Sequence, residues 1–167
     1  MKSTLIIFLL VFNCTCSASE IMKVFDGAKK ISTALEKGDW SVALNAMDPR
    51  YLSHLGITQK DLKEKVEELK MQFLESGVKF SKSIPRLPQK IIELKSYRLA
   101  FVTTEIAMTM KETKVTGEGL LIAVKYQGQN EWKYLDASSM PRSAILSFYS
   151  ELPKDVVIPK VRIEIEK

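Results

Sequence analysis

The sequence predicts an α+β fold in which helices come first and an antiparallel sheet follows. Before Gly77, apolar residues recur at spacings of three and four, as in the stripe Ile21, Val24, Phe25, Ala28, Ile31 and Leu35. Beyond Gly77 the period falls to two, and long runs over 99–110 and 115–126 are rich in strand-forming residues. Helices and strands segregated along the chain in this way favour an α+β architecture.

Three helices are predicted by their stripes and their ends. The first carries the stripe just described. Asp39 then caps a short second helix that carries Trp40, Ala43, Leu44 and Met47. Asp48 and Pro49 close this helix, because the residue before a proline avoids helical geometry. Thr58 and Asp61 resemble a capping box, so a third helix is expected to begin there.

The strands are predicted where apolar and polar side chains alternate, over 78–81, 92–95, 99–110, 115–126 and 132–137. Gly117 and Gly119 interrupt the fourth of these strands and suit a bend or a bulge. Pro141 opens a short helix, since proline is tolerated in the first helical turn. Residues 161–167 form a C-terminal tail that either adds an edge strand or frays.

The first 18 residues have the layout of a secretory signal. Lys2 gives a positive start, an apolar run follows over 5–12, and Cys16, Ser17 and Ala18 form a small-residue exit. The apolar run is too short to span a bilayer of about 30 Å. We therefore expect export to the periplasm or the medium, cleavage after Ala18, one domain over 19–160, and no integral membrane segment once the signal is removed.

The two cysteines, Cys14 and Cys16, both precede this cleavage point. The mature protein would then contain no disulfide, which argues against a small stapled extracellular scaffold. The alternative is that Cys14 or Cys16 is the first mature residue and carries a lipid anchor. Against this, Asn13 and Thr15 stand where bacterial lipoproteins usually place a small residue.

Composition excludes several classes of function. The net charge of +5 is modest and dispersed, and no basic cluster is interleaved with aromatic residues, so we expect no nucleic-acid partner. One histidine without mature cysteines cannot supply a structural zinc site, so no metal is expected. Because no phosphate-binding glycine loop and no nucleophile elbow is present, we also expect no cofactor.

The strand over 132–137 holds the candidate site. Trp132, Tyr134 and Asp136 alternate, so they point to one face. Apolar surroundings raise the pKa of a carboxyl group and suit a general acid or base. Alternatively, both aromatic side chains are core and Asp136 hydrogen-bonds the following turn. His54, the only histidine, either carries protons or is an ordinary loop or packing residue.

The order of elements resembles the nuclear transport factor 2-like superfamily. The strings LEKGDW (35–40), MDPRY (47–51) and WKYLDA (132–137), with Leu152-Pro153 and Ile158-Pro159, are similar to small, exported, uncharacterised bacterial members. The resemblance covers roughly residues 20 to 160. It implies helices packed against a strongly curved antiparallel sheet to form a cone, a cavity between them, and homodimers formed through the outer face of the sheet.

This fold hosts isomerases, dehydratases, polyketide cyclases and binding proteins, so it does not fix an activity. We expect an exported non-enzymatic domain that binds a small apolar ligand or a partner protein in or around the cavity. Its expected pocket residues are Trp132, Tyr134, Tyr51, Trp40 and Met108. The alternatives are a cofactor-free acid–base enzyme (isomerase, dehydratase or hydrolase) that uses Asp136 and with it His54, and an interaction role through the dimer face.

Overall fold

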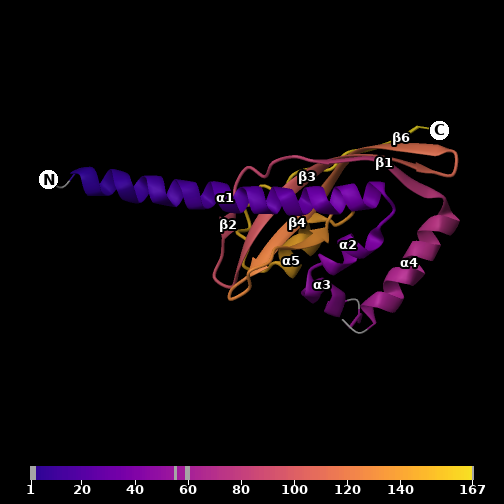
Figure 1. Cartoon of the computed structure of the whole chain (residues 1–167), viewed down its shortest axis with the longest axis horizontal. Helices are drawn as coiled ribbons and strands as arrows, with labels where there is room; N and C mark the ends of the chain where they lie inside the picture. The colour runs from indigo at the N-terminus through magenta and orange to yellow at the C-terminus, as the bar shows by residue number, and fades with distance from the viewer. Residues whose placement is uncertain (1–2, 55, 59–60, 167) are drawn as a thin grey trace.

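The structure is a computed structural model that describes residues 3–54, 56–58 and 61–166. The side chains of residues 3–17, 63, 66, 69, 70, 73, 74 and 166 lie outside this description, and Cys14 and Cys16 are among them. The elements follow in the order α1 Ser3–Glu36, α2 Trp40–Asn45, α3 Pro49–His54, α4 Leu62–Ser76, β1 Val78–Pro85, β2 Ile92–Glu93, β3 Tyr97–Met110, β4 Thr113–Tyr126, β5 Lys133–Asp136, α5 Arg142–Phe148 and β6 Ile163–Glu166 (Figure 1).

The α+β class is confirmed, because helices lead the chain and a six-stranded antiparallel sheet follows. The strand order is β1-β3-β4-β5, with β2 paired to β3 and β6 paired to β4. In this order β1 and β5 stand at opposite ends, so the described sheet is open rather than closed. The C-terminal tail does add an edge strand, β6.

Of the bend or bulge predicted at Gly117 and Gly119, the bulge is wrong for the hairpin of β3 and β4. β3 and β4 stay in register over their whole length, and the irregularity lies in β1 between Phe80 and Lys82. Gly117 instead allows a close approach between two backbones. A Cβ atom at this position would lie 2.2 Å from the backbone oxygen of Arg162, so glycine is what allows β6 to lie against β4.

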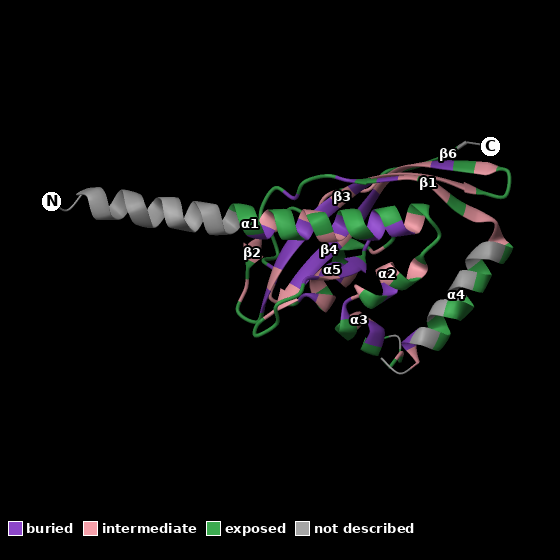
Figure 2. Cartoon of the chain, viewed as in Figure 1, coloured by how far each residue is buried: buried purple, intermediate pink, exposed green. Residues whose placement is uncertain are grey.

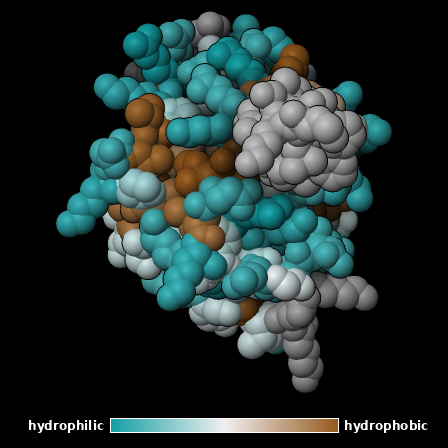
Figure 3. Space-filling view, turned by 90° about the vertical axis from the view of Figure 1, so that its left-hand side faces the viewer, coloured by the Kyte–Doolittle hydropathy of each residue, from teal (hydrophilic) through white to brown (hydrophobic). Residues whose placement is uncertain are grey.

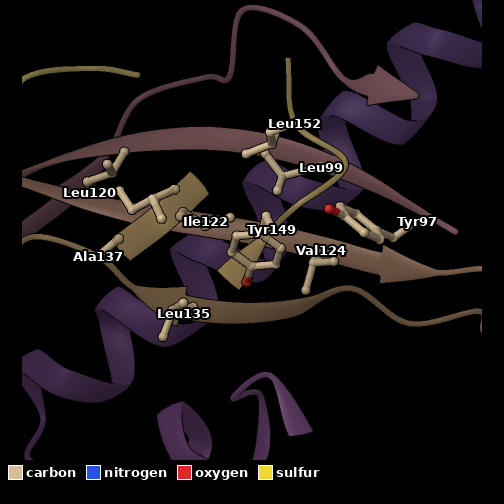
Figure 4. Close-up of a cluster of buried hydrophobic side chains, with 10 residues drawn as sticks. Tyr97, Leu99, Leu120, Ile122, Val124, Leu135, Ala137, Tyr149 and Leu152 are labelled. Atoms are coloured by element: carbon tan, nitrogen blue, oxygen red, sulfur yellow. The ribbon is translucent and has the colours of Figure 1, made fainter. Parts of the chain in front are cut away.

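Both faces of the sheet are covered over its central part. On one face α1 buries its stripe against strands β3, β4 and β5, in a cluster of Val24, Ala28, Ile31, Ala100, Val102, Ala123, Trp132 and Tyr134. On the other face α5 and the segment after it cover a second cluster, which holds Leu99, Ile122, Leu135 and Tyr149 (Figure 4). Neighbouring residues of one strand therefore both become buried, as the purple strands of Figure 2 show.

The helices differ from the predicted ones at their ends. α1 runs without a break through Ala18, from the predicted signal into the domain. Along the described residues, no helix has a stretch apolar and long enough to cross a membrane. The sequence predicted no helix between α2 and α4, whereas the structure forms α3 there. Thr58 and Asp61 do hydrogen-bond to each other, and α4 begins one residue later.

The chain ends lie at opposite ends of the molecule, and β6 lies at the end away from the N-terminus. Seen from the N-terminal end of α1, one area of hydrophobic surface is surrounded by hydrophilic residues (Figure 3). α4 lies apart from the sheet and is joined to β1 at its C-terminal end. The helices α2 and α3 lie between α1 and α4 in the view of Figure 1.

Candidate functional site

The two aromatic residues predicted for the pocket lie beneath α1. Tyr134 is 5% exposed and its hydroxyl donates to the backbone oxygen of Val24 at 2.9 Å. Gly27 makes this approach possible, since a Cβ atom there would lie 2.0 Å from the tyrosine hydroxyl oxygen. Burial raises the pKa of Tyr134, and the negative charge of Asp26 adds to this effect. The hydroxyl is therefore a fixed donor that holds α1 on the sheet.

Trp132 is fixed by a carboxylate that sequence reasoning did not single out. Its indole N–H donates to Glu20 at 3.2 Å, and Lys125 contacts the same carboxylate oxygen at 3.4 Å. Lys23 bonds the other oxygen at 2.6 Å. The hydrogen bond from Lys23 lowers the pKa of the Glu20 carboxyl group, and Lys125 lowers it further against the effect of burial. Glu20 therefore anchors α1 at its entry to the domain.

Asp136 does not join these aromatic residues in a pocket. Its side chain is exposed at the end of β5, and its Oδ1 atom accepts from the Ser138 N–H at 2.9 Å and from the Ser138 hydroxyl at 2.6 Å. Ser138 in turn accepts from the backbone N–H of Leu120 at 3.0 Å. These are the contacts of a residue that shapes the turn after the strand.

His54 lies elsewhere, at the end of α3. It is exposed, and its ring meets that of Phe148 edge-on at 6.3 Å between centroids. The structure gives His54 and Asp136 no common partner among the described hydrogen bonds. Neither of them lines the groove described below. Neither a described hydrogen bond nor either of the two depressions described below therefore joins the acid–base pair that the sequence suggested.

The remaining predicted pocket residues are dispersed. Tyr51 packs against Phe148, with ring centroids 6.1 Å apart, on the α5 side of the sheet. Trp40 contacts Phe80 at 5.7 Å between ring centroids and packs beside the small cluster of α2 and α3. Met108 is half-buried on β3, paired with Val115.

A buried carboxylate that the sequence did not indicate as a site joins α3 to the sheet and the C-terminal region. Asp48 is 0% exposed and accepts from the hydroxyl of Tyr126 at 2.8 Å and from that of Tyr149 at 2.9 Å. The backbone N–H of Arg50 donates to it at 2.9 Å, which is the contact of a helix N-cap. Sequence offered one signal, the Asp-Pro step, which closes α2 and also starts α3.

The two tyrosines around Asp48 remain hydrogen-bond donors. Burial raises the pKa of both hydroxyls above the ordinary tyrosine value, and the negative charge of Asp48 raises it further. The guanidinium of Arg50 lies over the rings of Tyr126 and Phe148, 5.7 and 5.3 Å from their centroids. These donors satisfy a carboxylate that is 0% exposed, so the network stabilises the fold.

A groove lies among α2, α3 and the start of α4, and we take it as the candidate binding site. Its volume is about 1090 Å³. Apolar side chains form its walls: Leu44, Met47, Leu52, Ile57 and Leu62. Polar side chains from Ser41, Asn45, Ser53, Thr58, Gln129 and Lys133 also line it, together with the carboxylate of Glu67. Apolar walls with a few polar groups are typical of small-molecule sites, whose volumes are about 300–1,000 Å³.

A smaller depression of about 500 Å³ adjoins this groove, because both are lined by Asn45 and Lys133. Trp132 and Tyr134 border it beside Lys30 of α1. The aromatic strand thus reaches the edge of the candidate site, although most of each ring is buried under α1. The combined surface can hold an apolar body in the groove and place a cation at its rim.

In three comparisons with known proteins, no family model, no curated protein and no solved structure matches the chain. Within the described part of the chain, no three carboxylate, histidine or cysteine side chains are grouped as metal ligands would be. The candidate site is therefore defined by its own geometry.

Proposed function

We propose that the chain is an exported, non-enzymatic binding domain that takes a small, mostly apolar ligand in the groove among α2, α3 and α4. The observation that carries this proposal is the groove itself, with its apolar wall of leucine, isoleucine and methionine side chains and its volume of about 1090 Å³. Ligand sites of this kind bury most of a small molecule against apolar walls and orient it with few polar groups.

The rim around Lys133 supports a preference for a negative or hydrogen-bond-accepting ligand group at that end of the groove, whereas the carboxylate of Glu67, which also lines the groove, disfavours such a group beside it. Lys133 lines both the groove and the adjoining depression, and its ammonium group donates to Glu131 at 3.1 Å. Glu131 is itself largely exposed, with 79% of its side chain accessible, so its pairing with Lys133 is weak and an anionic ligand group can replace it. An aliphatic carboxylate fits this combination.

We also propose, on the order of its elements, that the chain belongs to the nuclear transport factor 2-like class and that its helices and sheet form a cone. The long hairpin of β3 and β4 behind α1 supports this assignment. In such a cone the ligand would enter between the helices and the sheet. The groove lies on the helical side, beside β5.

A ligand screen tests the proposal. Thermal unfolding is followed with a series of fatty acids and of uncharged apolar compounds of the same length, and we expect stabilisation by a subset of them. Ser53→Trp fills the groove from an exposed position on α3 and should abolish the shift. Ser143→Trp adds the same side chain at an exposed position of α5 and should leave it intact.

The two variants distinguish binding in the groove from binding elsewhere. Stabilisation that is lost in S53W and kept in S143W supports binding in the groove. A shift that survives S53W places the ligand elsewhere and contradicts the proposal. So does the lack of any stabilisation across both series of compounds.

A further inference from the structure

The outer edge of β6 is the feature that carries a further inference. β6 pairs with β4 on one side, and no other described strand pairs with it. Its apolar residues Ile163 and Ile165 are 49% and 65% exposed. Proteins usually protect such an edge, because unpaired backbone groups can pair with another chain. We propose that two copies of this chain form a homodimer by antiparallel pairing of their β6 edges, centred on Ile163.

Backbone direction shows which groups are available. The backbone oxygen of Arg162 accepts from the Glu118 N–H of β4 at 2.8 Å, so position 162 points its backbone groups at β4. Since backbone direction alternates along a strand, positions 163 and 165 point their N–H and C=O groups outward. Ile163 placed opposite the partner's Ile163 would exchange both hydrogen bonds. The outward groups of β6 therefore suit a symmetric antiparallel pair.

Charge selects the register. Centring on Ile163 places Arg162 opposite the partner's Glu164, and symmetry repeats this pair on the other side of the centre. Such pairs do not exchange backbone hydrogen bonds, and their Cα atoms lie about 4.5 Å apart, so the charged side chains are close. Centring one residue later would instead place Glu164 opposite the partner's Glu164. The second register would still place Arg162 opposite the partner's Glu166, but it contains the pair of like charges at Glu164, whereas the first register pairs only opposite charges. Charge therefore favours the first register.

Apolar side chains follow the same symmetry. Ile163 meets its own copy, and Ile165 lies opposite position 161, which is valine. The short strand β6 would lengthen over 160–162 when it gains this partner, and the two sheets would become one continuous sheet. This interface uses the edge of the sheet and is independent of the ligand groove, whereas the family resemblance implies contact through the outer face.

The mass of the protein in solution tests the pairing. The full-length chain is expressed with its leader, purified as the cells deliver it, and its N-terminus is read by mass spectrometry. We expect sedimentation to give the mass of a dimer and hydrogen exchange to show a protected Ile163 amide. Arg162→Glu should halve the mass, because it places a carboxylate opposite the partner's Glu164 twice.

A charge swap provides the decisive comparison. R162E/E164R restores opposite charges across the two chains and should recover the dimer, although the carboxylate at position 162 still faces Glu118 of its own chain. Lys79→Glu makes the same charge change at the opposite edge of the sheet, at an exposed site on β1, and should leave the dimer unchanged.

Four results would overturn the proposal: a monomeric wild type, a free Ile163 amide in a wild-type dimer, an R162E variant that stays dimeric, or a folded charge-swap variant that stays monomeric. Protection of the Ile163 amide only after an unrelated extended peptide is added would also overturn it. That result would identify β6 as a docking edge for another chain.

Discussion

Removing one buried hydroxyl group should reveal how much the Asp48 network stabilises the fold. In Tyr149→Phe the ring stays in its fully buried position, while the 2.9 Å bond to the Asp48 carboxylate is lost. Hydrogen bonds to charged groups contribute about 1.5–3 kcal/mol. We expect the free energy of unfolding to fall by roughly 2 kcal/mol. For a domain of this size, that lowers the melting temperature by about 4–8 °C.

Tyr97→Phe is a matched control in the same cluster. Tyr97 is 4% exposed, and its hydroxyl oxygen accepts from the uncharged backbone N–H of Glu151 at 3.3 Å. A neutral bond contributes about 0.5–1.5 kcal/mol, and this one is long, so the loss should lie at the lower end of that range. Both variants delete one oxygen from a buried ring, so the difference between them measures the contribution of the charged partner.

Urea unfolding of both variants provides the measurement, and the dependence of stability on urea should stay unchanged. Adding Asp48→Asn to Tyr149→Phe completes a double-mutant cycle, in which we expect a coupling of about 0.5–3 kcal/mol. A cost for Y149F no greater than that for Y97F would refute the reasoning. So would additive effects of D48N and Y149F.

Two further predictions concern the way α1 is held on the sheet. Glu20→Gln should cost about 1.5–3 kcal/mol near pH 7. The pKa of Glu20 in the folded protein lies below its ordinary value of 4.5, so this stabilisation is present above pH 4.5 and is lost as the pH falls through the folded pKa. The urea midpoints of E20Q and of the wild type should therefore converge in acid. Gly27→Ala should destabilise by about 1–3 kcal/mol despite a gain in helix propensity of about 1 kcal/mol, because its Cβ atom would lie 2.0 Å from the Tyr134 hydroxyl. Adding Tyr134→Phe should recover part of this loss in thermal unfolding, and no recovery would contradict the clash.

Much of the fold could be predicted from periodicity. Spacings of three and four located the part of α1 that packs on the sheet, and the alternation over 99–110 located β3. These patterns are local, since each residue reports on neighbours within a turn or a pleat. The same approach missed α3, because the step from Asp48 to Pro49 was interpreted only as the end of the preceding helix, whereas Pro49 is also the first residue of α3. It also allowed a bulge as one interpretation of Gly117 and Gly119, whereas β3 and β4 stay in register and Gly117 accommodates the backbone before β6.

The candidate site was less predictable, because its geometry depends on segments far apart in the chain. Trp132 and Tyr134 were recognised as neighbours on one face, but the partners that fix them, Glu20 and Val24, lie 112 and 110 positions away. Asp136 sat in the same alternation, yet its bonds to Ser138 turn it toward the following loop.

The sequence by itself determined the class of fold and the faces of the long strands, because hydropathy and its period are properties of neighbouring residues. Only the tertiary structure decided that Asp48 would be buried beneath Tyr149, 101 positions later, and that the short helices would border a groove. The physical reason is that the burial of a polar group depends on which donors packing brings to it. Those donors come from elements far apart in the chain, and the period of apolar residues within one element does not indicate which other elements will pack against it.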